Sequence, residues 1–116
     1  MSRINQSPDF TLKAGDTAPP IEVQVLTGLR EVVALTGATQ PEFHMWKRRT
    51  REVIVDADAE ITSEASGTMA YSWTGSDTAD PGLYEGEFQI TLSGGEGTVT
   101  IPNDGYYLIE ILPAIA

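Results

Sequence analysis

The feature that most constrains the fold is a long stretch, Gly82–Leu92, in which side chains of one kind recur at every second position. Tyr84, Gly86, Phe88, Ile90 and Leu92 share one parity, and mostly polar residues occupy the other. A period of two residues is that of a β-strand with one buried face, because successive side chains of a strand point to opposite sides. The stretch is therefore predicted to be the longest strand of the protein.

Shorter stretches of the same kind, separated by turn residues, occupy much of the remaining sequence. In one of them Met69, Tyr71 and Trp73 fall on a single face, and the glycine-rich run at 94–97 is typical of a hairpin turn. Together with the long stretch they give about eight short strands and no convincing helix, which indicates an all-β sandwich or barrel. The shorter predicted strands are 21–25, 31–35, 39–47, 53–57, 68–74, 98–101 and 106–112.

A local motif at the start of the longest strand narrows this choice. Asp80-Pro-Gly-Leu-Tyr84 has the Asp-x-Gly-x-Tyr form of a tyrosine corner, in which the tyrosine hydroxyl bonds to backbone just upstream. The alternative is a plain turn followed by a core tyrosine. We expect the corner, and with it an immunoglobulin-like β-sandwich of about 7–8 strands with an extended N-terminal arm.

The proposed arm comprises residues 1–20, and residues 21–116 form a single β-sandwich domain. The first twenty residues are rich in Ser, Asn, Gln, Asp and Gly and end in Pro19-Pro20, which favours extended, unpacked chain. Within them Phe10 and Leu12 alternate with polar neighbours. This stretch could add as a strand to a neighbouring protein, so both residues are predicted interface residues.

Composition excludes several classes of protein. The 116 residues suffice for one domain, and the absence of cysteine excludes disulfides and thiolate metal sites. A formal net charge of −10 argues against nucleic-acid binding, because phosphates repel such a surface. No apolar stretch approaches the roughly 20 residues of a membrane helix, and the N-terminus lacks the apolar region of a signal peptide. We therefore expect neither nucleic acid nor a membrane as a partner.

No residue pattern points to catalysis or to a bound metal or cofactor. His44 is the only histidine, and no Gly-x-Ser-x-Gly motif accompanies it. Asp56, Asp58 and Glu60 alternate and could share one face of a strand, but the EF-hand pattern fails at its sixth and twelfth positions. A solvated acidic edge explains them better. The expectation is a protein that is not an enzyme, with no catalytic, cofactor-binding or metal-binding residues and no cofactor.

A basic cluster stands out in this acidic chain. It holds four of the seven Lys and Arg residues, and Trp46 precedes it. The cluster is either a solvated hairpin tip or a docking point for an acidic partner. Trp46 faces outward if Phe43 and Met45 face the core, and it is the core tryptophan if the alternation is inverted. The residues predicted here as an interface are Trp46, Lys47, Arg48, Arg49 and Arg51.

The order of several short motifs resembles the N-terminal domain of phage baseplate upper proteins. The resemblance covers roughly residues 14–112, nearly the whole chain. Each motif alone is weak, but their order and spacing together are fairly specific. The motifs are Gly15–Pro20, Ile21–Leu26, Val33–Thr39, Phe43–Met45, Tyr71–Phe88 and Ile101–Tyr106.

The resemblance implies an immunoglobulin-like sandwich that attaches to a phage tail or baseplate and has no enzymatic activity. Such a protein is made in the bacterial host cytoplasm and is found in the virion, in several copies, against itself or other tail, baseplate or capsid proteins. Because the sequence stops at Ala116, with no long C-terminal extension that could form a fibre or hold a receptor-binding tip, an adaptor role is expected rather than direct host recognition.

Two other functions stay open at this point. Small sandwiches of this kind also recur on phage heads, so the protein could be a capsid decoration protein. A carbohydrate-binding module would need a platform of exposed aromatic rings. Against it, Tyr71, Trp73, Tyr84 and Phe88 fall on predicted core faces.

Overall fold

The computed structural model describes residues 7–27, 29–95, 97–102 and 104–114. This part of the chain contains nine strands and no helix, hence none long and apolar enough to cross a membrane. The strands are β1 (Phe10–Lys13), β2 (Ile21–Gln24), β3 (Thr39–Lys47), β4 (Val53–Asp58), β5 (Glu60–Ser63), β6 (Thr68–Tyr71), β7 (Gly82–Leu92), β8 (Gly97–Ile101) and β9 (Tyr107–Leu112).

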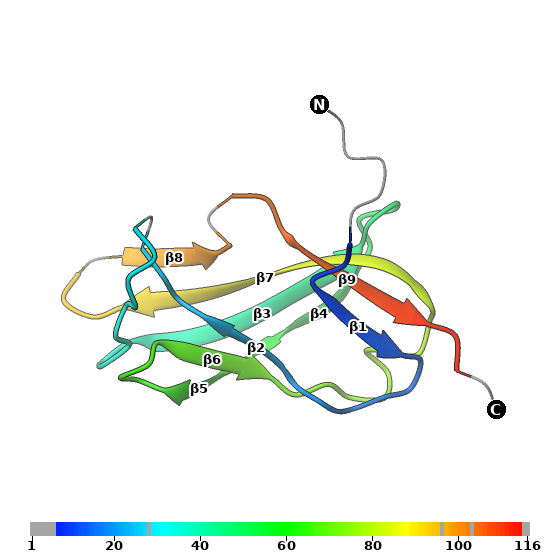
Figure 1. Cartoon of the computed structure of the whole chain (residues 1–116), viewed down its shortest axis with the longest axis horizontal. Helices are drawn as coiled ribbons and strands as arrows, with labels where there is room; N and C mark the ends of the chain where they lie inside the picture. Colours follow the sequence, from blue (N-terminus) through cyan, green and yellow to red (C-terminus); the bar gives the residue numbers. More distant parts are fainter. Residues whose placement is uncertain (1–6, 28, 96, 103, 115–116) are drawn as a thin grey trace.

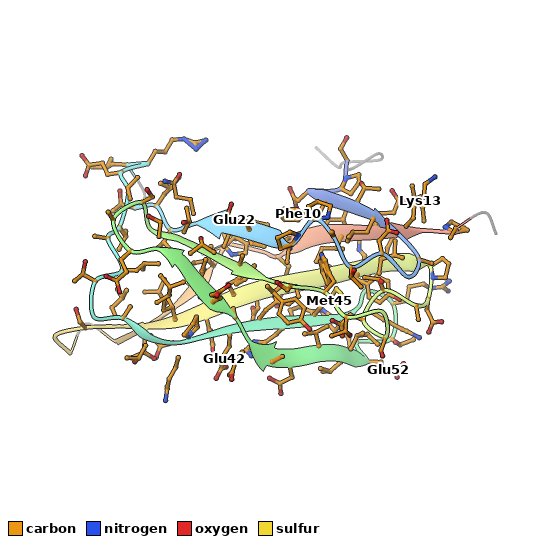
Figure 2. All side chains as sticks on the ribbon, turned by 90° about the horizontal axis from the view of Figure 1, so that it is seen from below. Phe10, Lys13, Glu22, Glu42, Met45 and Glu52 are labelled. Carbon is orange, nitrogen blue, oxygen red and sulfur yellow. The ribbon has the colours of Figure 1, made fainter. Side chains whose placement is uncertain are left out.

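The strands form two sheets (Figure 1). The larger sheet has the order β1-β9-β7-β3-β4, with β8 also paired to β7, and the smaller has the order β2-β6-β5. Met45 points into the interior, whereas Glu42 and Glu52 project outward (Figure 2). Two sheets without a helix make a β-sandwich, so the predicted all-β sandwich is confirmed, with nine described strands instead of the predicted 7–8.

The long strand β7 organises the larger sheet. It pairs with β3 along one edge, while its other edge pairs first with β9, over Gly82–Gly86, and then with β8, over Phe88–Leu92. Its inward residues are those that the alternation predicted, since Tyr84, Phe88 and Ile90 are buried. Gly86 leaves room for its neighbours, because a Cβ there would lie 3.3 Å from the Phe43 ring and 3.1 Å from the His44 carbonyl oxygen.

An aromatic cluster centred on Phe43 joins the two sheets. The Phe43 ring centroid lies 4.8 Å from that of Phe88 in the same sheet, 5.0 Å from that of Tyr71 in β6 and 5.6 Å from that of Trp73. Trp73 is therefore the core tryptophan, and the predicted inward face of Met69, Tyr71 and Trp73 is confirmed. Aromatic side chains bury large apolar areas, so this cluster contributes much of the core.

The tyrosine corner is present. The Tyr84 hydroxyl donates a hydrogen bond to the Asp80 carbonyl oxygen at 2.6 Å, from a side chain that is otherwise buried. The bond fixes the segment that crosses from the smaller sheet into β7.

Replacing Tyr84 by phenylalanine should lower the free energy of unfolding by about 1 kcal/mol, because the Asp80 carbonyl loses its partner. Denaturant unfolding measures this value. Tyr106→Phe is the matched control, since that side chain is half-exposed and its hydroxyl forms no hydrogen bond with a described residue, and it should change stability little. Equal effects of the two substitutions would contradict a stabilising role for the corner.

The predicted N-terminal arm is wrong for the residues described. Phe10–Lys13 form β1, which pairs in parallel with β9, and Leu12 is only 6% exposed within the core. The loop that follows is also attached, because the buried Thr78 hydroxyl donates to the Asp16 carbonyl oxygen at 2.8 Å. Composition alone suggested an unpacked segment, because it cannot show that a partner strand, β9, lies at the other end of the sequence. Residues 1–6 of the predicted arm lie outside the described residues.

Two strand predictions around the smaller sheet also need correction. Residues 31–35 form no strand, since only a single bridge joins Val32 to Leu26 and the Leu35 amide donates instead to the Glu64 carbonyl. Residues 60–63, predicted as no strand, form β5. The chain passes from the larger to the smaller sheet at Ala59, between β4 and β5.

The predicted acidic edge is therefore divided. Asp56 and Asp58 lie on β4 in the larger sheet, and Glu60 lies on β5 in the smaller one. Alternation along the sequence places the three carboxylates on one face on the assumption that residues 56–60 form a single continuous strand. The change of sheet at Ala59 removes that assumption.

Candidate interaction surface

The tip of the β3–β4 hairpin carries the basic cluster and is held by backbone hydrogen bonds. The Lys47 amide donates to the Glu52 carbonyl and the Arg51 amide donates to the Lys47 carbonyl, both at 2.8 Å. The Arg48 amide donates to the Leu83 carbonyl of β7 at 3.0 Å. The tip is thus attached to the neighbouring strand, and this backbone presents its side chains in a defined arrangement.

The cations of the tip differ in how far they are neutralised. Lys47 lies 3.5 Å from a Glu52 carboxylate oxygen, and Arg48 and Arg51 lie 3.7 and 3.9 Å from carboxylate oxygens of Glu85. Arg49 is exposed and has no ion pair with any residue that the structure describes. Arg49 is therefore the cation at the tip most available to an external anion.

Trp46 lies on the outer face of the larger sheet, which settles the choice that the sequence left open. Its indole Nε1 donates to Glu85 Oε1 at 3.0 Å, and its ring packs edge-on against Tyr106, with centroids 4.8 Å apart and planes at 87°. Phe43 and Met45, on the other parity of the strand, are fully buried. Because the two rings are nearly perpendicular, Trp46 and Tyr106 do not form a flat platform for a sugar ring.

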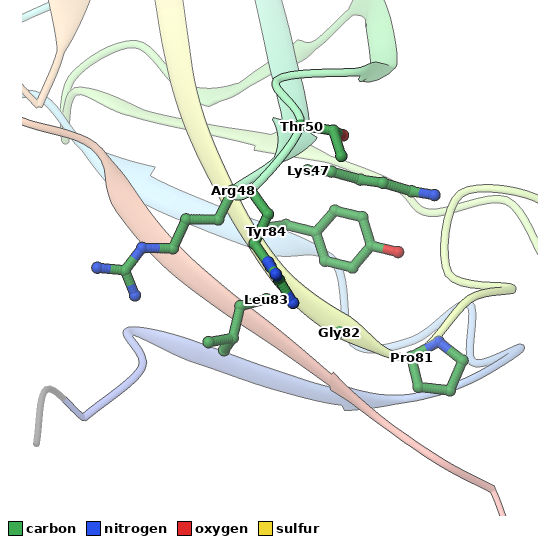
Figure 3. A pocket seen from close by; sticks show the side chains of 8 residues that line it. Lys47, Arg48, Thr50, Pro81, Gly82, Leu83 and Tyr84 are labelled. Carbon is green, nitrogen blue, oxygen red and sulfur yellow. The ribbon is translucent and has the colours of Figure 1, made fainter.

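A hollow of about 580 Å³ opens between the hairpin tip and the start of β7 (Figure 3). One side carries the basic residues of the tip, and the other carries Pro81, Gly82 and Leu83, of which Leu83 is 43% exposed. This combination suits an acidic group flanked by an apolar one. The lining residues are Lys47, Arg48, Arg49, Thr50, Pro81, Gly82, Leu83 and Tyr84.

The tyrosine that lines this hollow stays neutral. Burial raises the pKa of the Tyr84 phenol above its ordinary value, and the nearby Asp80 carboxylate raises it further, while Lys47 acts in the opposite direction. A neutral phenol adds no negative charge to the basic wall.

Two predicted interface residues, Phe10 and Leu12, are not part of this surface. They lie on β1, which β9 and β7 separate from β3 in the sheet. The Phe10 ring packs against Tyr107 of the same chain with centroids 5.6 Å apart, and Leu12 is buried in the core. Burial of Leu12 removes it from any external contact in the folded domain.

Sequence reasoning missed a second group on the same outer face, around His44. Its Nε2 lies 3.2 Å from Glu42 Oε1 and 3.3 Å from Asp56 Oδ1, and its Nδ1 lies 3.5 Å from Glu87 Oε2. The alternation of Glu42, His44 and Trp46, and that of Glu85 and Glu87, were visible in the sequence. The pairing of β3 with β4 and β7 was not, and it is this register that brings the group together.

Comparison with known proteins adds no relative. No protein-family model, curated protein or solved structure matches the chain.

Proposed function

We propose that this protein is a non-enzymatic structural component of a tailed-phage virion, a small immunoglobulin-like adaptor of the tail or baseplate. It docks through the hairpin tip and the adjoining hollow onto an acidic group of a neighbouring virion protein. The observation that carries the proposal is Arg49, which is exposed and forms no ion pair with a described residue, beside a hollow with one apolar side, in a chain of net charge −10. The motif order that resembles baseplate upper proteins supports the virion assignment.

The charge distribution explains why docking would use this end of the domain. Acidic copies repel one another and other acidic proteins at distances within the Debye length, about 8 Å at physiological salt. Four of the seven basic side chains are concentrated at the tip, where they attract an acidic partner locally and orient it. Leu83 and the Trp46 ring lie beside these cations. Their apolar surface would be removed from water when a partner protein binds.

Reversing the charge of Arg49, as Arg49→Glu, should slow association with particles that lack this protein by about tenfold at low salt, and by less at high salt. Melting of the isolated domain should barely change, because exposed charges contribute little to folding. Biolayer interferometry at several salt concentrations measures the rates. The matched control is Arg30→Glu, an equal charge change in the segment before β3, at the other end of that strand (Figure 1).

Equal slowing by both variants would show a general charge effect and would remove the tip as the docking point. Leu83→Ala should instead weaken attachment by an amount that salt does not change.

Fractionation of purified virions tests the location, since the chain should be recovered with tails. Recovery with heads would make it a capsid decoration protein, and absence from virions would overturn the proposal.

A further inference from the structure

The group around His44 combines the donors of a metal site on one face of the larger sheet. His44 and Glu42 come from β3, Asp56 comes from β4, and a ligand atom from each lies within 4.8 Å of the other two. The cross-strand pairing places His44 opposite Asp56 on one side and opposite Glu87 on the other. Rigid neighbouring strands, not loops, thus supply all the donors.

Glu87 distinguishes this arrangement from a simple cluster of carboxylates. Its Oε2 lies 3.5 Å from His44 Nδ1, whereas Glu42 and Asp56 face Nε2. In this structure the imidazole shares its hydrogen bond with Glu42 through Nε2, and Glu87 lies at ion-pair distance from Nδ1. When a metal ion takes the Nε2 lone pair, the ring proton is on Nδ1, and Glu87 is placed to accept a hydrogen bond from it. Metal-binding histidines are commonly oriented in this way by a carboxylate behind the ring.

Two of the three donor spacings match those around a small ion. Bonds of about 2.0–2.2 Å in a tetrahedral zinc site place neighbouring ligand atoms about 3.3–3.6 Å apart. His44 Nε2 lies 3.2 and 3.3 Å from the two carboxylate oxygens. The imidazole is 20% exposed while Asp56 is largely exposed, so the histidine is held and the outer carboxylate can adjust.

We propose that Glu42, His44 and Asp56 bind a divalent transition-metal ion of the Zn²⁺ class, with Glu87 as the residue that orients the imidazole. The imidazole nitrogen favours such ions over Ca²⁺ and Mg²⁺, which prefer oxygen ligands. Three protein ligands leave a fourth position open to solvent. This inference does not depend on the docking proposal and revises the expectation, drawn from the sequence, of no metal site.

Isothermal titration of the full-length, tag-free protein with Zn²⁺ tests the site, with Ca²⁺ as the comparison ion. We expect one Zn²⁺ per chain and a raised melting temperature. His44→Ala should weaken binding at least 100-fold, and Glu87→Gln should weaken it about 10–100-fold, as for other orienting carboxylates. Glu60→Gln is the matched control, a carboxylate on β5 in the other sheet, and should leave binding unchanged.

Because His44 is the only histidine, its imidazole resonances report the site directly. Zn²⁺ should shift the Nε2 signal and leave Nδ1 protonated, and the same titration of Glu42→Gln covers the case in which His44→Ala does not fold. Saturable binding that survives in both His44→Ala and Glu42→Gln would mean adventitious surface binding and would overturn the proposal. So would Zn²⁺ binding no tighter than Ca²⁺ binding, or an unshifted Nε2 signal.

Discussion

Replacing Phe88 by alanine should lower the free energy of unfolding by about 3–5 kcal/mol. The Phe88 side chain is fully buried in β7, and its ring lies 4.8 Å from that of Phe43 at the centre of the core. Truncation removes its contacts with the core and leaves a cavity that the rigid strands on either side of β7 cannot close. Urea unfolding followed by tryptophan fluorescence measures the change, and the core residue Trp73 supplies the signal.

The control for this substitution is Leu83→Ala, a truncation on the same strand at a half-exposed position. It should cost about 1 kcal/mol or less, because solvent already covers much of that side chain. A near-neutral Phe88→Ala would mean that the inward face of β7 is assigned to the wrong parity.

Replacing Leu12 by alanine should cost about 2–5 kcal/mol, the usual range for a buried leucine. Leu12 is placed in the core by the parallel pairing of β1 with β9, where it lies opposite Ile111. In a free arm the same substitution would have no effect on stability. Thermal and urea unfolding of the purified domain distinguish the two.

Thr11→Ala provides the comparison, since Thr11 is exposed on the same strand and its truncation should cost little. Removal of residues 1–14 should destabilise the domain at least as much as Leu12→Ala, because it exposes the β9 edge as well. Unchanged stability of the truncated chain would restore the arm that composition suggested.

The long and strongly alternating elements could be predicted from the sequence, because their pattern is local. The bounds of β3 and β7 agree with the predicted stretches, and the Asp-x-Gly-x-Tyr motif predicted the hydrogen bond of Tyr84. For β7 the local pattern also predicts which face is buried, whereas the facing of Trp46 on β3 stayed open until the structure placed it.

The short strands could not be predicted, because tertiary pairing decides them. β1 has four residues and acquires its partner from the far end of the chain, whereas β5 depends on the change of sheet at Ala59. Residues 31–35 form a short apolar run typical of a strand, yet their backbone groups bond to several separate segments of the chain.

The same limit applies to the candidate sites. The basic tip is contiguous in sequence, so it could be found from the residues alone. Asp56 lies on β4 and Glu87 lies on β7. Only the register of β3 with these two strands brings both carboxylates to the imidazole of His44. Composition also could not show that Glu85 partly neutralises Arg48 and Arg51.

The parallel pairing of β1 with β9 has a mechanical consequence. The two arrows run the same way in Figure 1, so the chain enters β1 at one end of this strand pair and leaves β9 at the other. Tension between the two ends of the domain therefore slides the strands along each other and loads their hydrogen bonds together. An antiparallel terminal pair would instead unzip one bond at a time. This terminal strand pair is therefore arranged to resist tension applied along the chain.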